Sequence, residues 1–529
     1  MQACCIVALL RIAAMWLTVG YFVSAANDAF AKGKLLIRVV DAQTQAELPF
    51  RIHLRNQAKV PVRLSPQLPF WIDHTSVPGA LQLELLRGNY FFEIEHGPEY
   101  VNTTGFFTLN DGADDDKVVE LKRACSMSGA DWWSGDLDVR RPLRDLELSM
   151  AADDLNVVPL VTWTHRQTAW AKEKPPVPAV TTFGANTFCD ALGGADDRDG
   201  GPIRIFRLPQ PLPVDPASTA PIAARVAELS DLATQHPSLH IDVDAAAWDL
   251  PILVATGRVD SVNLLNSQLR RDRVVPNPAV RPFDKKLYLP TTGPAEYAEQ
   301  IYFQLLNCGL KIAPSAGSGS GTGAVLGGNP GPTAIANPIG YNRVYVQVPR
   351  VAMNYDAWWE GLKSGRTVVT NGPLMRPKAN GAPPGYVFAA QSGSAVTLEL
   401  SMELTTRDKI SYVEVIRDGR VAQSLPIRDW AADGGRFAPL KFEQSGWCLI
   451  RARCDIANNY RVAMSAPWYV EIDVKPRVSR TSAQFFLDWV EERAKKLAEL
   501  KTADAAAIEA AVVAARTYWK GLVDSADAP

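Results

Sequence analysis

Two aspartates and an arginine alternate along one short stretch of the chain, at Asp136, Asp138 and Arg140. If residues 135–140 are extended, the three side chains point to one side of a strand, because successive residues face opposite ways. Carboxylates hold metals and move protons, whereas a guanidinium stays protonated and repels cations. The spacing predicts a compensating Asp138–Arg140 ion pair. The alternatives are an Arg140 that binds an anionic, carboxylate-bearing ligand, and residual catalysis.

Three further polar positions are candidates for the same pocket. His165 lies near Trp163 and Trp170, and the two indoles form either a stacking wall for a sugar or aromatic ligand or part of the core. Asp260 and Asn266 lie near the expected end of a strand, where polar residues line a pocket or hydrogen-bond to loops. The candidate pocket therefore comprises Asp136, Asp138, Arg140, His165, Asp260 and Asn266.

The elements that must position these residues fall into four stretches. Residues 33–122 predict a β-sandwich. Residues 123–385 alternate strand and helix patterns, which favours βα units around a mostly parallel sheet or barrel. Residues 386–474 predict a second β-rich module, and residues 475–529 a helical tail. The tail is expected to dock through one apolar helix face, which carries Phe485, Phe486, Trp489 and Val490.

Several of these stretches resemble known families. Residues 88–94 (GNYFFEI) resemble a strand of transthyretin-like and carboxypeptidase-regulatory-like sandwiches. Residues 129–137 (GADWWSGDL) resemble the first strand of PHP-domain (polymerase and histidinol phosphatase-like) metallohydrolases, in their secreted CehA/McbA-like branch. Two later motifs of that branch are similar in the same order, at residues 306–318 and 361–373. The resemblance implies an α/β fold: a distorted PHP-like (β/α)7 barrel between two β-sandwich-like modules, with a helical tail.

The resemblance also implies a chemistry that this chain departs from. Family members hold metals on His, Asp and Glu at strand ends and activate water for phosphoester or amide hydrolysis. Here Asp138 and Arg140 replace the His-x-His pair, residues 318–321 (SGSG) lack the acidic ligand, and His165 alone aligns with a surviving ligand. We expect a metal-free, cofactor-free hydrolase homologue with a ligand-binding or structural role. The alternative is a hydrolase that holds one zinc or manganese ion on Asp136, Asp138, His165 and Asp260.

The N-terminus predicts export. Arg11 precedes an apolar run at residues 12–23, and residues 29–31 (AFA) fit a cleavage site, so residues 1–31 read as a signal peptide. A retained anchor is the alternative. No other apolar run reaches the ~18 residues of a membrane span, so the mature chain is expected to lack a transmembrane segment. The expected location is periplasmic, at the cell surface or secreted.

Five cysteines follow the expected cleavage site. Cys448 and Cys454 could pair across a hairpin, whereas the others, Cys125, Cys189 and Cys308, are expected to be buried thiols.

Composition narrows the class of partner. With 529 residues, two to four domains are expected. Hydrophobic residues at 47% and charged residues at 21% exclude a disordered or polytopic membrane protein. The net charge of −2 argues against a nucleic-acid partner. The expected partner is an anionic or sugar-like small ligand.

Overall fold

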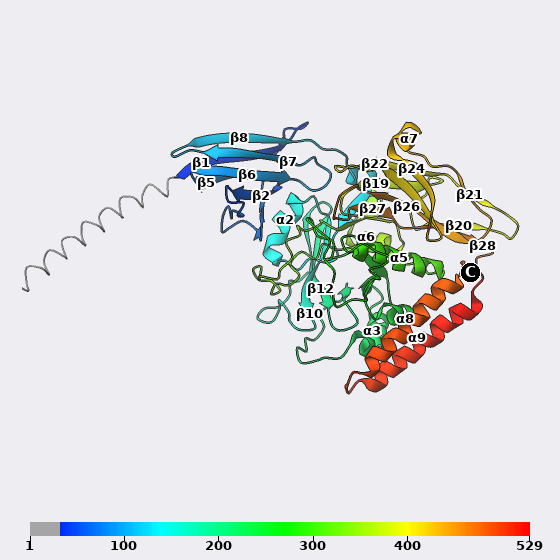
Figure 1. Cartoon of the computed structure of the whole chain (residues 1–529). Coiled ribbons are helices and arrows are strands. Elements are labelled where there is room, and N and C mark those ends of the chain that lie inside the picture. Colours follow the sequence, from blue (N-terminus) through cyan, green and yellow to red (C-terminus); the bar gives the residue numbers. More distant parts are fainter. Residues whose placement is uncertain (1–31) are drawn as a thin grey trace, which may run out of the picture. The chain divides into compact units, whose positions relative to one another are not determined.

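The structure is a computed structural model that describes residues 32–529, so the expected signal peptide lies outside the described residues. The chain is a mixed α/β, multidomain protein with several sheets, one of them large, and a C-terminal pair of helices (Figure 1). It divides into two compact units. One contains the chain up to His96 together with residues 100–123, and the other contains residues 97–99 and 124–529.

Strands alone make up the regular structure of the first unit, in its described part. They are β1 (Lys32–Asp41), β2 (Phe50–Asn56), β3 (Phe70–Trp71), β4 (His74–Val77), β5 (Ala80–Leu86), β6 (Gly88–Glu95), β7 (Thr103–Leu109) and β8 (Asp114–Leu121). Two sheets form, in the orders β5-β1-β8 and β3-β4-β2-β6-β7. Alternate residues of β1, among them Leu35, Ile37 and Val39, enter one core that strands of both sheets share.

The second unit combines a large mixed sheet with helices. Its strands are β9 (Trp132–Gly135), β10 (Val157–Thr164), β11 (Val180–Gly184), β12 (Thr187–Asp196), β13 (Ile203–Phe206), β14 (His240–Asp244), β15 (Ser261–Leu265), β16 (Ala313–Ala316), β17 (Arg343–Gln347), β18 (Thr367–Thr370), β19 (Leu374–Ala379), β20 (Val387–Ala390), β21 (Val396–Leu398), β22 (Leu400–Thr405), β23 (Tyr412–Arg417), β24 (Arg420–Pro426), β25 (Leu440–Phe442), β26 (Gly446–Arg453), β27 (Val462–Ser465) and β28 (Trp468–Ile472). Its α-helices are α2 (Leu146–Ala152), α3 (Val226–Gln235), α4 (Leu250–Ala255), α5 (Gly293–Asn307), α6 (Tyr355–Lys363), α7 (Ile427–Ala432), α8 (Arg480–Ala498) and α9 (Ala505–Ser525).

One half of the large sheet runs in the order β16-β15-β14-β13-β12-β10-β9. All of these strands except β13 point in the same direction, so their C-terminal ends lie at one edge. The segment after β9, residues 136–140, bonds to β10 and to β16. Leu137 N donates to Ala316 O (3.0 Å), and Val161 N donates to Val139 O (2.9 Å). The segment therefore lies between β10 and the chain that leaves β16.

A row of polar side chains follows from the register of these strands. Apolar residues of β14 enter the hydrophobic core, while Asp242 and Asp244 alternate with them. Arg204 pairs with Asp242, Asp244 with Asn263, and Asn263 with Ser315. Because paired residues of neighbouring strands point the same way, these five side chains share one face. All of them are buried.

The other half of the large sheet is antiparallel apart from the parallel pair β20–β28, and it lies over a separate core. It runs in the order β17-β18-β27-β26-β23-β24, with β20 and β28 alongside. The pairs β19–β22 and β21–β25 form two small sheets, and their side chains enter the same core as Val415 and Trp468. Strands β20–β28 lie within residues 386–474, the stretch predicted to be β-rich.

The C-terminal helices α8 and α9 lie side by side (Figure 1). Ser479 caps α8, since its side chain accepts a hydrogen bond from Ser482 N. The predicted docking face is confirmed: Phe486, Trp489 and Val490 are buried, with Phe485 packed partly against the same core. The indole of Trp489 also donates to Trp248 O (3.1 Å).

Within residues 32–529, no helix has the length and apolarity that crossing a membrane requires. The cysteines of this part are thiols, buried at Cys189, Cys308, Cys448 and Cys454 and half-buried at Cys125. The possible Cys448–Cys454 disulfide does not form. Cys448 lies within β26 and Cys454 directly follows it, so six residues of extended chain separate them by about 20 Å. A disulfide needs Cα atoms within about 7 Å.

Candidate functional site

Asp136, directly after β9, accepts hydrogen bonds from two loops, one at Ser318 and one at Gly340. Its Oδ1 accepts from the backbone N–H groups of Asp138 (3.0 Å) and Ser318 (2.9 Å). Its Oδ2 accepts from Ser318 Oγ (2.5 Å) and Gly340 N (2.6 Å). Burial raises the pKa of Asp136, and the four hydrogen bonds oppose that shift. Because a carboxylate has about four acceptor positions, none is left for another ligand.

Asp138 and Arg140 form the predicted ion pair, with Arg140 Nε 3.0 Å from Asp138 Oδ1. The rest of the Arg140 guanidinium binds Asp197, through Nη1 (2.6 Å) and Nη2 (3.1 Å). Burial alone would raise the pKa of Asp138, but the guanidinium groups of Arg140 and Arg204 lower it to about 2. Arg140 is therefore compensated within the protein.

Arg204, on β13, lies where three carboxylates converge. Its Nη2 donates to Asp138 Oδ2 (3.0 Å), and its Nη1 donates to Asp244 Oδ1 (2.8 Å) and Asp242 Oδ2 (3.3 Å). The side chain is 1% exposed. Burial opposes its charge, but the three carboxylates outweigh burial and hold the pKa of Arg204 above its usual range. A fixed positive charge thus sits at the centre of the acidic cluster.

Asp242 is the most heavily hydrogen-bonded carboxylate of this centre. Its Oδ1 accepts from the hydroxyls of Ser261 (2.6 Å) and Ser315, and its Oδ2 accepts from Asn263 Nδ2 (3.2 Å) as well as Arg204. Asp244 has fewer donors. Burial raises the pKa of Asp244 to about 6 against the opposing effect of Arg204.

The residues of this centre do not fit a metal ion. The carboxylates of Asp138, Asp242 and Asp244 already accept from guanidinium or neutral donors. A divalent cation among them would lie close to the charges of Arg204 and Arg140, neither of which can lose its proton in a protein. The chemistry available here is charge compensation and hydrogen bonding.

His165 borders a cavity of about 180 Å³ at the same edge of the sheet. Its Nε2 accepts from Arg166 Nε (3.0 Å), which leaves the ring proton on Nδ1, 3.5 Å from Asp196 Oδ1. Burial lowers the pKa of His165 despite the nearby Asp196. The cavity wall carries both donors and acceptors, from His165, Asp196, Arg198, Asp215, Ser218, Arg225 and Glu228.

The two indoles near His165 have different surroundings. Trp163 lies against Gly194, where a Cβ would come within 2.0 Å of its ring, and its Nε1 donates to Leu192 O (2.9 Å). It packs in the core and also reaches the cavity wall. Trp170 donates to Thr162 Oγ1 (3.0 Å) and is not part of that wall. Core packing therefore accounts for most of the Trp163 surface.

The structure does not bring Asp260 and Asn266 into this site. Asp260 precedes β15 and so lies at the opposite edge of the sheet, where it accepts from Ile241 N (2.9 Å) and pairs with Lys363 (3.3 Å). Asn266 follows β15 at the correct edge, but its Oδ1 accepts from Gln268 N (3.0 Å) and stabilises its own loop. Asp136, Asp138, His165 and Asp260 thus do not converge as one ligand set.

A different group of potential ligands lies in the first unit. Among the described residues, only His53, Asp73 and His74 form a group of three His, Cys, Asp or Glu side chains whose possible metal-ligand atoms all lie within 4.8 Å of one another. Arg51 Nη1 contacts His53 Nε2 (2.8 Å), and since arginine can only donate, the ring proton of a neutral His53 is on Nδ1, facing Asp73 (3.4 Å). The group is therefore a hydrogen-bonded cluster, with Arg55 also on Asp73 (3.3 Å).

The sequence interpretation missed Arg204, Asp242, Asp244 and Asp196. The sequence contains a signal for three of these residues. Arg204 interrupts the apolar run 203–206 (IRIF), and an arginine inside a buried strand needs an acidic partner. Asp242 and Asp244 alternate with apolar residues in 240–244 (HIDVD), which places them on one strand face. Nothing in the sequence indicates which acidic residue pairs with Arg204.

No family model matches the chain, and neither does any curated protein. Among solved structures, it is distantly similar to the Bacillus anthracis TIE protein, at 19% identity over 22% of this chain and 20% of that chain, with a TM-score of 0.15. A pilus-presented adhesin matches at 15% identity over 17% of this chain and 26% of that chain, with a TM-score of 0.14. A Parabacteroides merdae beta-glucuronidase matches at 9% identity over 80% of this chain and 62% of that chain, with a TM-score of 0.17. The chain thus spans less than two thirds of each of these proteins.

Proposed function

We propose that residues 123–385 form a distorted PHP-like barrel that has lost its metal centre and serves in ligand binding. Support for the barrel comes from the segment after β9, which bonds to β10 on one side and to the chain after β16 on the other. Support also comes from the polar residues that gather at the C-terminal edge of the parallel strands, the edge where barrel enzymes place their sites. The three family-like motifs have the matching order.

One observation carries the metal-free part of the proposal. The guanidinium of Arg204 donates to Asp138 and Asp244 at 3.0 and 2.8 Å, in the middle of the acidic cluster. A buried ion pair of this kind compensates the carboxylates that would otherwise need a cation. The protein is then a hydrolase homologue without metal-dependent hydrolysis.

The ligand that suits the His165 cavity is a small, sugar-like molecule. The wall mixes two arginines with three carboxylates and a serine hydroxyl. Arg198 and Arg225 already donate to Asp196, Ser218 and Glu228, so a ligand meets mainly the remaining acceptor positions of the carboxylates, including Asp215. An anionic ligand at Arg140 is less favoured, because Asp138 and Asp197 already take its N–H donors. At about 180 Å³ the cavity is smaller than the ~300–1,000 Å³ typical of drug-sized ligands.

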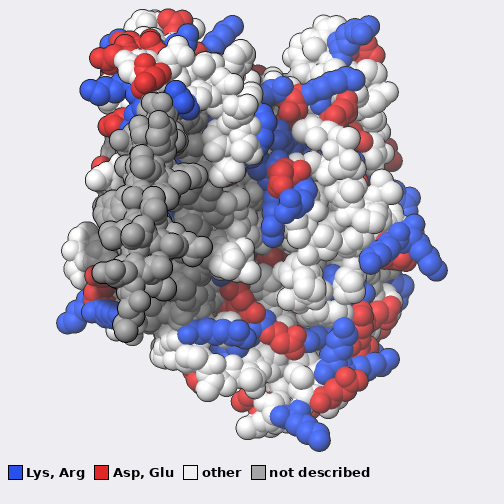
Figure 2. Space-filling view, turned by 60° about the vertical axis from the view of Figure 1, so that its left-hand side comes forward, with Lys and Arg blue, Asp and Glu red and all other residues white. Residues whose placement is uncertain are grey.

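The charges on one face of the molecule bear on the class of partner. Figure 2 shows Lys and Arg side chains interspersed with Asp and Glu over the face in view, without a continuous basic stripe. On that face, the mixture of charges is not the pattern of a nucleic-acid interface. We also propose export, on the signal-like residues 1–31.

Two measurements test the proposal on the full chain, expressed with its own N-terminus and purified without chelator. Elemental analysis should find less than about 0.1 zinc, manganese or iron per chain, and one ion per chain would overturn the metal-free assignment. Calorimetric titration with glucose, galactose, mannose, arabinose and N-acetylglucosamine should detect binding that His165→Asn weakens at least tenfold. The matched surface variant Glu403→Gln should bind normally. Absence of binding for all five sugars would overturn the ligand assignment.

A further inference from the structure

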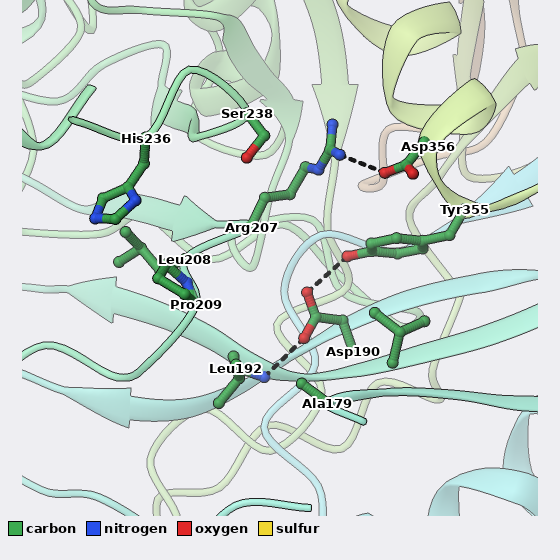
Figure 3. Close-up of a pocket in the computed structure, with 11 residues that line it drawn as sticks. Ala179, Asp190, Leu192, Arg207, Leu208, Pro209, His236, Ser238, Tyr355 and Asp356 are labelled. Carbon is green, nitrogen blue, oxygen red and sulfur yellow. Dashed lines mark hydrogen bonds and ion pairs between the residues drawn. The ribbon is translucent and has the colours of Figure 1, made fainter. Parts of the chain in front are cut away.

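A second cavity, of about 500 Å³, opens at the opposite edge of the large sheet. Asp190 lies near the start of β12, Arg207 follows β13, and Tyr355 begins α6, whereas the His165 cavity lies where β12 ends. Figure 3 shows these side chains around one space, with His236 and Ser238 on its rim. The volume is typical of small-molecule sites. The two cavities are therefore separate.

One end of this cavity is acidic, and its carboxylate forms no ion pair with a basic side chain of the described residues. Asp190 Oδ2 accepts from the Tyr355 hydroxyl (2.7 Å), and its Oδ1 accepts from Leu192 N (2.9 Å). No Lys, Arg or His within residues 32–529 forms an ion pair with Asp190, although the residue is buried. Burial raises its pKa. A buried carboxylate with only neutral donors has acceptor capacity left, and a ligand cation would stabilise its charged form.

The other end is basic and only loosely compensated. Arg207 has a left-handed backbone, with φ of +64°, and its guanidinium pairs with Asp356. The Asp356 side chain is 79% exposed, and pairs exposed in this way contribute little. An anionic ligand group can therefore replace Asp356. In the described chain the side chains of His236 and Ser238 make no hydrogen bond, so they too are available to a ligand.

We infer that this cavity binds a small zwitterion of the amino-acid class. Its carboxylate lies against Arg207, and its ammonium donates to Asp190 and to the Tyr355 oxygen. An aliphatic side chain contacts the apolar part of the wall, which consists of Ala179, Val180, Leu192, Leu208 and Pro209. The inference is independent of the proposed sugar-like ligand, since the two sites share no residue.

The first test uses the unmodified full chain and calorimetric titration with glycine, leucine, phenylalanine, glutamate and lysine. At least one should bind, with leucine favoured by the aliphatic wall. N-acetyl-leucine lacks the ammonium and leucinamide lacks the carboxylate, so each should bind at least tenfold more weakly than leucine. If none of the five amino acids binds at 10 mM, or if N-acetyl-leucine binds as tightly as leucine, the inference is wrong.

Variants assign the two ends of the ligand. Asp190→Asn keeps the size and one hydrogen bond of the side chain and should weaken leucine binding at least tenfold. Arg207→Gln, which removes the charge from a partly exposed side chain, should do the same. Asp356→Asn should tighten binding two- to fivefold, because it releases Arg207. Arg376→Gln, which removes another arginine with an exposed acidic partner, is the control and should leave affinity unchanged. Normal leucine binding by the Arg207→Gln variant would overturn the inference even if Asp190→Asn failed to fold.

Discussion

Arg204 lies on β13 and Asp138 in the segment after β9, 66 residues apart in the sequence, and their side chains meet with Nη2 and Oδ2 3.0 Å apart in the interior of the protein. The same guanidinium also binds Asp242 and Asp244 on the neighbouring strand. Removing one partner of a buried pair costs more than the pair itself contributes, because the other charge stays buried without compensation. The predictions about the centre follow from this relationship.

Replacing Arg204 with methionine should destabilise the protein by about 3–5 kcal/mol, since three carboxylates then lose their shared cation. Urea unfolding followed by tryptophan fluorescence measures the change. Arg376→Met is the matched control, because its partner Glu403 is exposed, and it should cost less than about 1 kcal/mol. If the two variants lowered the free energy of unfolding equally, the buried Arg204 pairs would contribute no more to stability than an exposed ion pair.

Placing histidines at positions 138 and 140 should not create a metal site. In the double variant Asp138→His with Arg140→His, the Arg204 guanidinium still lies against Asp242 and Asp244 and repels a cation. Elemental analysis after dialysis against zinc or manganese should find well below one ion per chain. Stoichiometric uptake would mean that Arg204 moves aside at little cost.

Because of Asp244, the free energy of unfolding should decrease as the pH rises from about 4 to about 6. Its pKa is about 6 in the folded protein and about 3.8 in a model peptide, so the folded state binds more protons across this window. The free energy of unfolding attributable to Asp244 is therefore greatest below pH 4, decreases as the pH rises, and is level above pH 6. The slope is at most about 1.4 kcal/mol per pH unit. Urea unfolding at several pH values should show this decrease relative to Asp244→Asn, and parallel curves for the two proteins would contradict the prediction.

Arg493 should be essential for the docking of α8. Its Nε donates to the buried Asp249 (2.6 Å), and its Nη atoms contact Asp199. Arg493→Met should cost about 3 kcal/mol and accelerate hydrogen exchange in α8 and α9. Arg516→Met, which removes an exposed pair with Glu491, is the control and should leave exchange in α8 nearly unchanged.

Thiol reactivity should separate Cys125 from the other described cysteines. Burial raises the pKa of Cys308 and of Cys454 to about 12, so their reactive thiolate forms are scarce at neutral pH. With Ellman's reagent, Cys125 should react fastest in the native protein, and all five should react after denaturation. A variant with Cys125→Ser should lose the fast phase. Rapid native reaction of Cys448 or Cys454 would contradict the burial of β26.

Local patterns determined much of this protein in advance. The alternation of Asp138 and Arg140 was enough to predict their ion pair, because alternate residues of an extended segment face the same side whatever the rest of the fold does. The apolar face of α8 likewise predicted its docking, since a helix buries the stripe that its period of 3.6 residues creates.

Only the tertiary structure decided the centre itself. Strand periodicity assigns Arg204, Asp242 and Asp244 to faces, but their meeting depends on β13 pairing with β14 and on the segment after β9 lying against the end of β16. Asp260 shows the same limit, because the direction of β15 places it at the opposite edge from Asp138. Strand order, direction and register come from contacts between distant parts of the chain, and hydrophobic burial across the whole sheet selects them.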